Sequence, residues 1–229
     1  MMIRAIIFDL DGTLVDTEPL HFQGFREVLA AEGIELGREE YFQRLIGYTD
    51  RECFSVVLRE HQRSGGSEFI DQLMARKAAR YMELIHGEDL YYPTAQEFVR
   101  ECARRFPLVL ATGTLRVEAE TILRRAGLRE LFVDVVAAED VERGKPAPDS
   151  FLLALRHLEG RPELESGIRP DECLAIEDTP AGVEAARAAN MKVLAIAHTS
   201  PAQSLAGADL VRPSLAETDL DDILRRLQS

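Results

Sequence analysis

The chain has 229 residues, which is enough for one large domain or for a core domain that carries a smaller inserted one. Its 27 basic and 40 acidic side chains give a formal net charge of −13. Nucleic acid and membrane surfaces are therefore poor partners, because both bind through a basic surface. No apolar run approaches the ~18 residues of a membrane span, and the amino-terminal residues lack a signal-peptide pattern, so we expect a cytoplasmic protein.

Five short apolar runs have the character of strands buried on both faces of a parallel sheet. Each run is followed by a turn signal and then by a helical pattern, which indicates an α/β fold. The runs cover residues 5–8, 108–111, 133–138, 173–176 and 193–196. The last residues, "LDDILRRLQS", predict a closing amphipathic helix.

Between the first and second runs, the pattern is helical and no convincing strand occurs. Pro19 lies near the start of the first predicted helix, and Gly33 lies just past its end. Further helical patterns, broken at "IGYTD" and "RSGGS", cover residues 38–46, 51–62 and 67–85. We therefore expect an all-α helical domain at 18–89, inserted into a core domain formed by 1–17 and 90–229. Connections near 16–18 and 87–93 would suit a lid that opens and closes.

The three cysteines, Cys53, Cys102 and Cys173, are scattered along the chain without a CxxC pair. An odd number with this spacing indicates neither a disulfide framework nor a zinc site. We expect reduced thiols in the core. The charged, Gly- and Pro-containing loop at 159–172 suggests no function.

The stretch "IRAIIFDLDGTLVDTE" ends its apolar run at two aspartates, Asp9 and Asp11. If the run is a parallel strand, both lie at its carboxyl end, where ligands bind in open α/β sheets. With a turn beginning at Gly12, two carboxyl groups can approach one reacting centre, and they also form a hard-oxygen site for Mg²⁺. The alternative is a simple strand-to-turn transition, because Asp and Gly favour turns.

Two later strand ends offer groups suited to an anionic oxygen. After "PLVLA" comes "TGT", where the Thr112 hydroxyl and the amides near Gly113 and Thr114 are exposed before a helix. Plain helix N-capping explains Thr112 and Thr114 equally well. In "ERGKPAPD", Lys145 stands between Gly and Pro on a constrained loop. A solvated surface lysine is the alternative there.

After "CLAI" comes "EDTPAGVEAA", in which Glu177 and Asp178 precede a helix. Thr179 and Pro180 have the character of its cap and first turn. The two acidic residues can simply complement the helix dipole. Several such groups at one sheet edge nevertheless favour a phosphoryl-transfer site over coincidence.

In this order, "DLDGTLVDTE", Thr112 after an apolar strand, "GKPAPD" and "EDTPAGVEAA" resemble the four motifs of the haloacid dehalogenase-like hydrolase superfamily. The resemblance spans residues 3 to about 200 and is to the branch of phosphatases and phosphoglucomutases with a helical cap after the first motif. It implies a Rossmann-like core with an inserted all-α cap, an aspartyl-phosphate intermediate and Mg²⁺.

By position, the resemblance makes Asp9 the nucleophile and Asp11 the general acid/base. Thr112 and Lys145 match the groups that bind the transferring phosphoryl. Such a nucleophile splits hydrolysis into phosphorylation of an aspartate and its release by water. Catalysis then consists mainly of positioning and electrostatic neutralisation.

For the metal, the resemblance points to Asp178, together with Glu177, and the ligand set is completed by Asp9 and Asp11. Carboxylates that face a phosphate would repel it without a cation, so the residues themselves also favour Mg²⁺.

Phosphoryl transfer is favoured over dehalogenation, because the dehalogenases lack an aspartate at the position of Asp11. Against a sugar phosphomutase, Asp50 stands where those enzymes carry an arginine, with Arg51 one residue late, and "TGTLRV" departs from their Ser-x-Ser-Lys-Asn pattern. His21 does stand where their hinge histidine would be. A phosphatase is preferred, a mutase is the alternative, and a non-catalytic binding protein is an alternative of another class.

Five residues of the predicted cap are candidate substrate contacts: His21, Tyr48, Arg51, Arg76 and Lys77. The alternative is packing near the hinge for the histidine and a solvated helix face for the arginines and lysine. We expect a small phosphorylated metabolite, such as a sugar or polyol phosphate, as the substrate, and a monomer or a weak dimer as the assembly.

Overall fold

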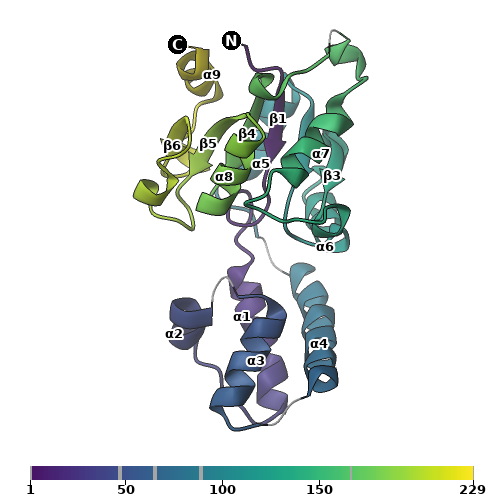
Figure 1. Ribbon diagram of the computed structural model, residues 1–229, viewed down its shortest axis with the longest axis vertical. Helices are drawn as coiled ribbons and strands as arrows, with labels where there is room; N and C mark the ends of the chain where they lie inside the picture. Colours follow the sequence, from purple (N-terminus) through teal and green to yellow (C-terminus); the bar gives the residue numbers. More distant parts are fainter. Residues whose placement is uncertain (1, 46–47, 64–65, 88–89, 166, 229) are drawn as a thin grey trace. The chain divides into compact units, whose positions relative to one another are not determined.

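The computed structural model describes residues 2–45, 48–63, 66–87, 90–165 and 167–228. The chain forms two compact units. The sheet unit consists of Met1–Asp16 and Leu90–Ser229, and the helical unit consists of Thr17–Asp89. Figure 1 shows the strands in the first unit and only helices in the second. No helix in the described part of the chain has both the length and the apolar character that a membrane span requires.

The sheet unit contains six parallel strands in the order β3-β2-β1-β4-β5-β6. Their bounds are β1 Ala5–Phe8, β2 Leu108–Ala111, β3 Phe132–Val136, β4 Cys173–Glu177, β5 Lys192–Ile196 and β6 Leu210–Arg212. This arrangement confirms the predicted α/β fold with a Rossmann-like parallel sheet. From β1 the chain adds β2 and β3 in one direction along the sheet, and it then crosses β1 to add β4, β5 and β6 in the other direction. The carboxyl ends of β1, β2 and β4 therefore meet at a topological switch point.

Two strand predictions were wrong in detail. The third strand stops at Val136, because Ala138–Asp140 form a 3₁₀ turn instead of extended chain. The short edge strand β6 was not predicted, because three partly buried residues give no apolar run.

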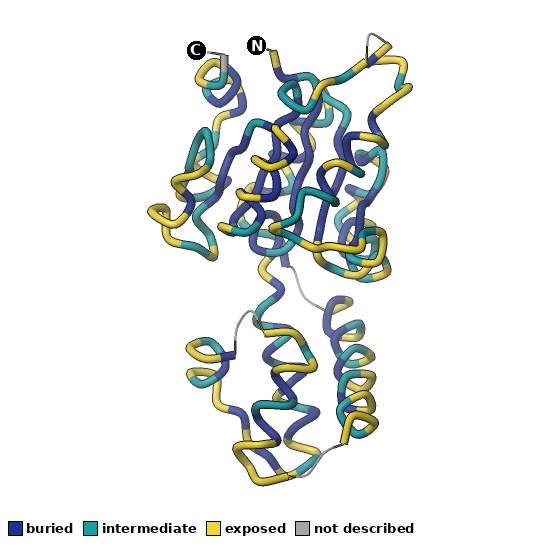
Figure 2. The backbone as a smooth tube through the Cα atoms, in the orientation of Figure 1, coloured by how far each residue is buried: buried dark blue, intermediate teal, exposed yellow. Residues whose placement is uncertain are grey.

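Burial on both faces explains why the strands read as continuous apolar runs (Figure 2). All four residues of β1 are fully buried. Ile7 packs on the side covered by α7, Asp149–Leu158, and α8, Pro180–Ala188. Phe8 meets Phe98 of α5, Ala95–Ala103, on the other side, with 6.2 Å between ring centroids. Helices thus cover both faces, as a parallel sheet requires.

Two further helices complete the sheet unit, α6 Arg116–Arg125 and α9 Leu220–Gln228. As predicted, α9 is amphipathic: Leu220, Ile223 and Leu224 are buried at helical spacing. All three cysteines of the chain are buried and unbonded to one another. Their burial agrees with the expected position in the core, and it raises the pKa of the Cys173 thiol to about 12.

The helical unit is built from α1 Glu18–Ala31, α2 Arg38–Glu40, α3 Asp50–Glu60 and α4 Ser67–Ile85. Pro19 lies in the first turn of α1, and Gly33 ends that segment with φ +75°, as the pattern predicted. Its core contains Phe25, Phe54 and Leu73, each almost completely buried.

The predicted helix at 38–46 was only partly right. After α2 the chain forms a π-helical turn, Tyr41–Leu45, in which Tyr41 and Phe42 both contact the ring of Phe22. The wider turn lets two consecutive aromatic side chains pack on one neighbour. Residues 46–47 and 64–65 in the two predicted breaks, and 88–89 in one predicted connection, lie outside the described residues.

Candidate active site

The carboxyl ends of three neighbouring strands hold most of the predicted site residues of the sheet unit. Asp9 directly follows β1, Thr112 directly follows β2, and Glu177 is the last residue of β4. Sheet hydrogen bonding extends past the strands: the amide of Asp9 donates to the Ile176 carbonyl at 2.9 Å. The positions of these side chains are therefore set by rigid backbone rather than by a free loop.

Lys145 connects these strand ends. Its ammonium donates hydrogen bonds to Asp9 Oδ1 at 2.5 Å, to Glu177 Oε1 at 2.6 Å and to the Ala111 carbonyl at 3.0 Å. Only 13% of its side chain is exposed. Burial by itself favours the neutral amine, but the carboxylates of Asp9 and Glu177 raise the pKa of Lys145 above its usual value. The lysine is a fixed positive charge, so the alternative of a solvated surface lysine is wrong.

Asp9, Glu177 and Asp178 form a buried acidic cluster, with carboxylate oxygens within 4.8 Å of one another. Burial, and then the nearby negative charges of Glu177 and Asp178, raise the pKa of Asp9 well above its usual range, while Lys145 opposes the rise. Burial and the charge of Glu177 raise the pKa of Asp178 to about 7. One lysine does not compensate three carboxylates, and a bound cation would relieve the remaining negative charge.

The donor set fits Mg²⁺. This ion prefers hard oxygen ligands and uses a few carboxylates together with water and substrate phosphate oxygens. Among the described residues, the cluster that could hold an ion contains Asp9, Glu177 and Asp178 but not Asp11, which the sequence had also suggested as a ligand.

The Asp11 carboxylate instead accepts hydrogen bonds from the hydroxyls of two threonines. Thr114 donates a short hydrogen bond to Asp11 Oδ2, and the Thr112 hydroxyl lies 3.5 Å from the same oxygen. The Thr114 amide donates to the Thr112 hydroxyl at 3.1 Å. Neither threonine caps α6, whose N-cap is Leu115, so the N-capping alternative was wrong. Gly113 between them is exposed, which leaves this loop open to a ligand.

Two threonines hold Asp178, and the sequence reading missed both. Thr13 donates to Asp178 Oδ1 at 2.9 Å, and Thr199 donates to Oδ2. Thr13 lies within the quoted first motif, but Thr199 follows β5 without a recognisable pattern. Gly12, with φ +77°, is required here, because a Cβ at this position would overlap the Asp178 carboxylate.

Glu177 lies across the N-terminus of α8. Its Oε2 accepts hydrogen bonds from the amides of Asp178 at 3.0 Å and Thr179 at 3.2 Å. Thr179 caps the helix, as predicted, by accepting from the Gly182 amide at 3.0 Å. A Cβ on Gly182 would lie far inside 3.0 Å of the Glu177 carboxylate. Glu177 thus does complement the helix N-terminus, and the same carboxylate holds Lys145.

His198 is a further neighbour of the first motif that sequence reasoning missed. Its Nδ1 donates to the Gly12 carbonyl at 3.0 Å, since a carbonyl can only accept. Its ring lies over Tyr92, with 3.9 Å between ring centroids. Burial lowers the pKa of His198 below its ordinary value. This histidine stabilises the turn that contains Gly12. The contact joins residues 186 positions apart, so no local sequence pattern predicts it.

In the helical unit, the structure brings together two of the five predicted substrate contacts. Lys77 donates to His21 Nδ1 at 2.7 Å and to Asp50 Oδ1 at 2.8 Å, and only 3% of its side chain is exposed. His21 stacks on Tyr81, with 4.3 Å between ring centroids. Burial, then the charge of Lys77, lowers the pKa of His21 to about 3. The imidazole is therefore neutral, and its Nδ1 accepts from the lysine.

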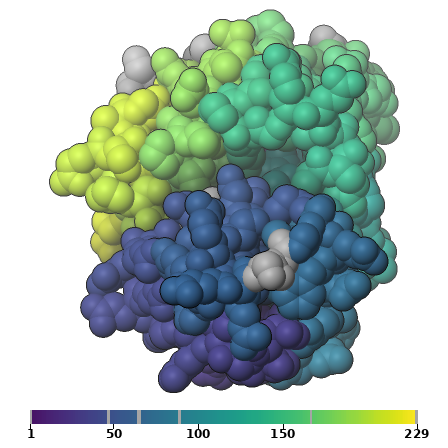
Figure 3. All heavy atoms as spheres, turned by 60° about the horizontal axis from the view of Figure 1, so that its bottom comes forward, coloured from purple at the N-terminus to yellow at the C-terminus, as the bar shows by residue number. Residues whose placement is uncertain are grey.

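The other three are exposed. The helical unit to which they belong is coloured purple to blue in Figure 3. Arg51 pairs with Asp71, Arg76 pairs with Glu32 at 2.5 Å, and Tyr48 is 48% exposed. Exposed pairs of this kind contribute little to stability. Their role as substrate contacts stays a prediction.

Comparison with known proteins agrees with this geometry. Residues 3–190 match the model of the haloacid dehalogenase-like hydrolase family. The chain is 31% identical over 198 residues to a phosphorylated carbohydrates phosphatase of Thermotoga maritima, covering 86% of this chain and 87% of the relative. It is 34% identical over 190 residues to the fructose-1-phosphate phosphatase YqaB of Escherichia coli, covering 82% and 93%.

Among solved structures, CbbY from Rhodobacter sphaeroides in complex with phosphate superposes with a TM-score of 0.78 at 31% identity, covering 94% of this chain and 96% of that one. The motifs, the sheet topology and these similarities agree. The chain belongs to the haloacid dehalogenase-like hydrolase family, in its branch of phosphatases and phosphomutases.

Proposed function

We propose that this hydrolase is a Mg²⁺-dependent phosphomonoesterase that acts on a small sugar or polyol phosphate through a phosphorylated Asp9. The observation that carries this proposal is the cluster at the switch point of the sheet. There, Lys145 lies between Asp9 and Glu177, Asp178 completes an acidic set, and Asp11 stays outside that set with its own hydroxyl partners.

The separation of the two aspartates supports different roles for them. In the first step, an Asp9 oxygen forms a bond to phosphorus while the bond from phosphorus to the substrate oxygen breaks, and Asp11 gives its proton to the departing oxygen. In the second step, Asp11 takes a proton from water, whose oxygen attacks phosphorus. The bond between phosphorus and Asp9 breaks, which releases inorganic phosphate and restores both side chains.

The remaining groups of the site position and neutralise the phosphoryl group. Lys145 orients Asp9 and offers positive charge to the phosphoryl oxygens, and the Thr112 hydroxyl and the Gly113 amide offer hydrogen-bond donors, while the Thr114 amide holds the Thr112 hydroxyl in place. Asp9 and Asp178, with Glu177 beside them, would hold Mg²⁺. When bound, Mg²⁺ supplies charge neutralisation for the oxygens of the transferring group.

The substrate class rests on relatives and on the helical unit. Two relatives are named as phosphatases of phosphorylated carbohydrates and of fructose 1-phosphate. We propose that residues 17–89 act as a cap, with His21 and Lys77 as its most strongly positioned polar groups. Asp50 bonds to Lys77, so the position where a mutase carries an arginine holds a negative charge, which favours hydrolysis over mutase action.

The test measures phosphate release from p-nitrophenyl phosphate and from a panel of sugar phosphates, with Mg²⁺ and with EDTA. We expect Asp9→Asn to abolish turnover and Asp171→Asn, a surface aspartate paired with Arg169, to leave it unchanged. Activity retained by Asp9→Asn would remove the nucleophile from the proposal, and full activity in EDTA would remove the metal. Isomerisation of a sugar phosphate without free phosphate would replace the hydrolase with a mutase.

A further inference from the structure

A cavity of about 470 Å³ lies in the sheet unit away from the candidate active site. It is formed by the turn after α5, by the start of β3 and by the loop that the proposed function leaves without a role. Its lining residues are Ala103, Arg104, Arg105, Phe106, Pro107, Glu130, Leu131, Phe132, Val133, Arg161 and Glu163.

This cavity lies at the amino-terminal ends of β2 and β3, whereas the acidic cluster lies at the carboxyl ends of β1 and β4. Pro107 immediately precedes β2, and Phe132 begins β3, whereas Thr112 directly follows the other end of β2. A four-residue strand spans about 13 Å, so a molecule held near Pro107 does not touch Thr112 or Asp9. The cavity is therefore a separate site.

Three guanidinium groups gather there in a chain whose net charge is −13. Among the described residues, the Arg104 side chain has neither a hydrogen bond nor an ion pair. Arg161 lies 3.6 Å from Glu163, beyond hydrogen-bond distance, and its Nε is buried without a partner in the described structure. Arg105 pairs with Asp221, which is largely exposed.

Local structural roles explain only part of this arrangement. Arg104 and Arg105 follow the last residue of α5 and complement the negative end of its dipole. Arg161 comes from a distant loop and has no such role. A buried N–H donor without an acceptor costs free energy, so each such group requires an explanation, and a missing ligand is one of them.

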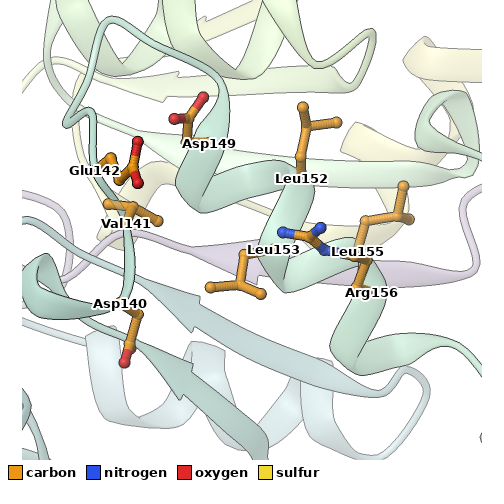
Figure 4. Close-up of a pocket in the computed structure, with 8 residues that line it drawn as sticks. All are labelled: Asp140, Val141, Glu142, Asp149, Leu152, Leu153, Leu155 and Arg156. Atoms are coloured by element: carbon orange, nitrogen blue, oxygen red, sulfur yellow. The ribbon is translucent and has the colours of Figure 1, made fainter.

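A second cavity of the sheet unit offers a contrast. Figure 4 shows the carboxylates of Asp140, Glu142 and Asp149 along one side of it. Two of these charges are already neutralised, because Asp140 pairs with Arg116 at 2.5 Å and Asp149 pairs with Arg143 at 2.7 Å. The 470 Å³ cavity, called the arginine cavity below, is different: of its three arginines only Arg105 has a comparable partner among the described residues.

We propose that the arginine cavity binds a small phosphate dianion, either inorganic phosphate or the phosphate group of a metabolite. The guanidinium fork matches phosphate oxygens with paired hydrogen bonds, and the Arg104 guanidinium, which has no partner among the described residues, is the donor such a ligand would use. Glu130 and Glu163 leave the lining with a net charge of only one positive unit. The two carboxylates would repel a polyphosphate or nucleic acid, which restricts the site to a small ligand.

The first experiment titrates the full-length protein with inorganic phosphate by calorimetry in EDTA, where the acidic cluster disfavours anions. The double variant Arg104→Gln/Arg161→Gln is compared with Arg124→Gln, an exposed arginine of α6 paired with Glu120. We expect binding about tenfold weaker or more in the double variant, since charge-assisted hydrogen bonds are lost, and no change in the control. All three proteins should have equal kcat/KM. Unchanged binding in the double variant, or equal loss in the control, would overturn the proposal.

The second experiment locates the anion in the unaltered protein. Crystals are soaked in tungstate, a phosphate-like dianion with a strong anomalous signal. A peak between Arg104 and Arg161 is the expected result, and a peak only beside Lys145 contradicts it. Repeating the titration with a sugar phosphate in EDTA identifies the source: tighter binding than inorganic phosphate points to a metabolite, and equal binding points to phosphate itself.

Discussion

Each unit of this protein contains a buried lysine that joins two side chains, and the two lysines are balanced differently. In the sheet unit, Lys145 bonds to Asp9 and Glu177, and Asp178 adds a third carboxylate nearby. In the helical unit, Lys77 bonds to one carboxylate, Asp50, and to a neutral imidazole.

The two buried clusters therefore differ in net charge. The helical cluster is electrically balanced, so it needs no further ion to be stable. The sheet cluster keeps excess negative charge in a buried place, which is expensive unless a cation binds. The sheet cluster therefore suits a metal ion and a phosphoryl group, in keeping with the proposed function, and the helical cluster has no comparable need of a cation.

We expect the largest loss of activity when the lysine of the sheet unit is removed. Lys145→Met leaves Asp9 and Glu177 facing each other without their shared donor. We expect kcat/KM to fall by about 10³-fold, the size of effect seen when a preorganised charge is removed from an active site. Phosphatase kinetics at saturating Mg²⁺ measure it, with Lys192→Met, a partly exposed lysine paired with Asp209, as the control. Similar losses in both variants would contradict a specific role for Lys145.

A second substitution tests whether the position of the Glu177 carboxylate is critical, and it does so without removing a charged group. Gly182→Ala places a methyl group where the Glu177 carboxylate lies, so the carboxylate must move and Lys145 loses a partner. We expect an activity loss of about 10²-fold, since small misplacements of catalytic groups have effects of that size. Gly207→Ala is the matched control, because its new Cβ would make only an ordinary 3.4 Å contact with Val183. Full activity in Gly182→Ala would show that the carboxylate position is not critical.

The helical cluster predicts a pH dependence of stability. The pKa of His21 is lowered to about 3 in the folded state and is 6.5 when unperturbed, so the unfolded state binds a proton first as the pH falls. Stability from this group is complete above pH 6.5 and decreases toward pH 3. At pH 5 the loss is about 2 kcal/mol relative to neutral pH.

Urea unfolding at pH 7.5 and pH 5 measures this loss, and His21→Gln should show a smaller difference between the two values. An equal difference in both proteins would assign the pH dependence to other groups. NMR titration of the His21 ring gives a direct check, because Lys77→Met removes the neighbouring charge and should raise the pKa of that ring.

The smallest expected effect comes from metal binding to the unbalanced cluster. Mg²⁺ at ten times its Kd should stabilise the folded protein by about 1.4 kcal/mol, because it binds the folded state preferentially. Thermal unfolding with and without Mg²⁺ measures this increase, which should be absent in Asp178→Asn and present in Asp171→Asn. An equal increase in Asp178→Asn would remove Asp178 from the ligand set.

Local patterns in the sequence were enough for much of this structure. The apolar run before Asp9 predicts β1 because a strand buried on both faces has no polar alternation. The cap of α8 at Thr179 was also readable, because capping depends on neighbours within three residues. In the helical unit, the predicted helix at 67–85 has the same bounds as α4.

Other features depend on residues far apart in the chain. Thr13 and Thr199 meet Asp178, and these contacts join residues 165 and 21 positions apart. The overlap that forbids a side chain at Gly182 depends on the direction in which the Glu177 carboxylate folds over α8. The edge strand β6 exists because β5 offers it a partner, not because its three residues favour extended chain.

The sequence alone was enough to place the ends of β1, β2 and β4 to within one residue, and therefore to show which chemical groups gather at the carboxyl ends of these strands, because such ends follow from local apolar runs and turn residues. Only the tertiary structure decided how those groups are paired. It separated Asp11 from the acidic cluster, bound Lys145 between two carboxylates and gave Lys77 a neutral partner. Pairing depends on distances between distant segments, and in a buried site those distances determine charge balance and function.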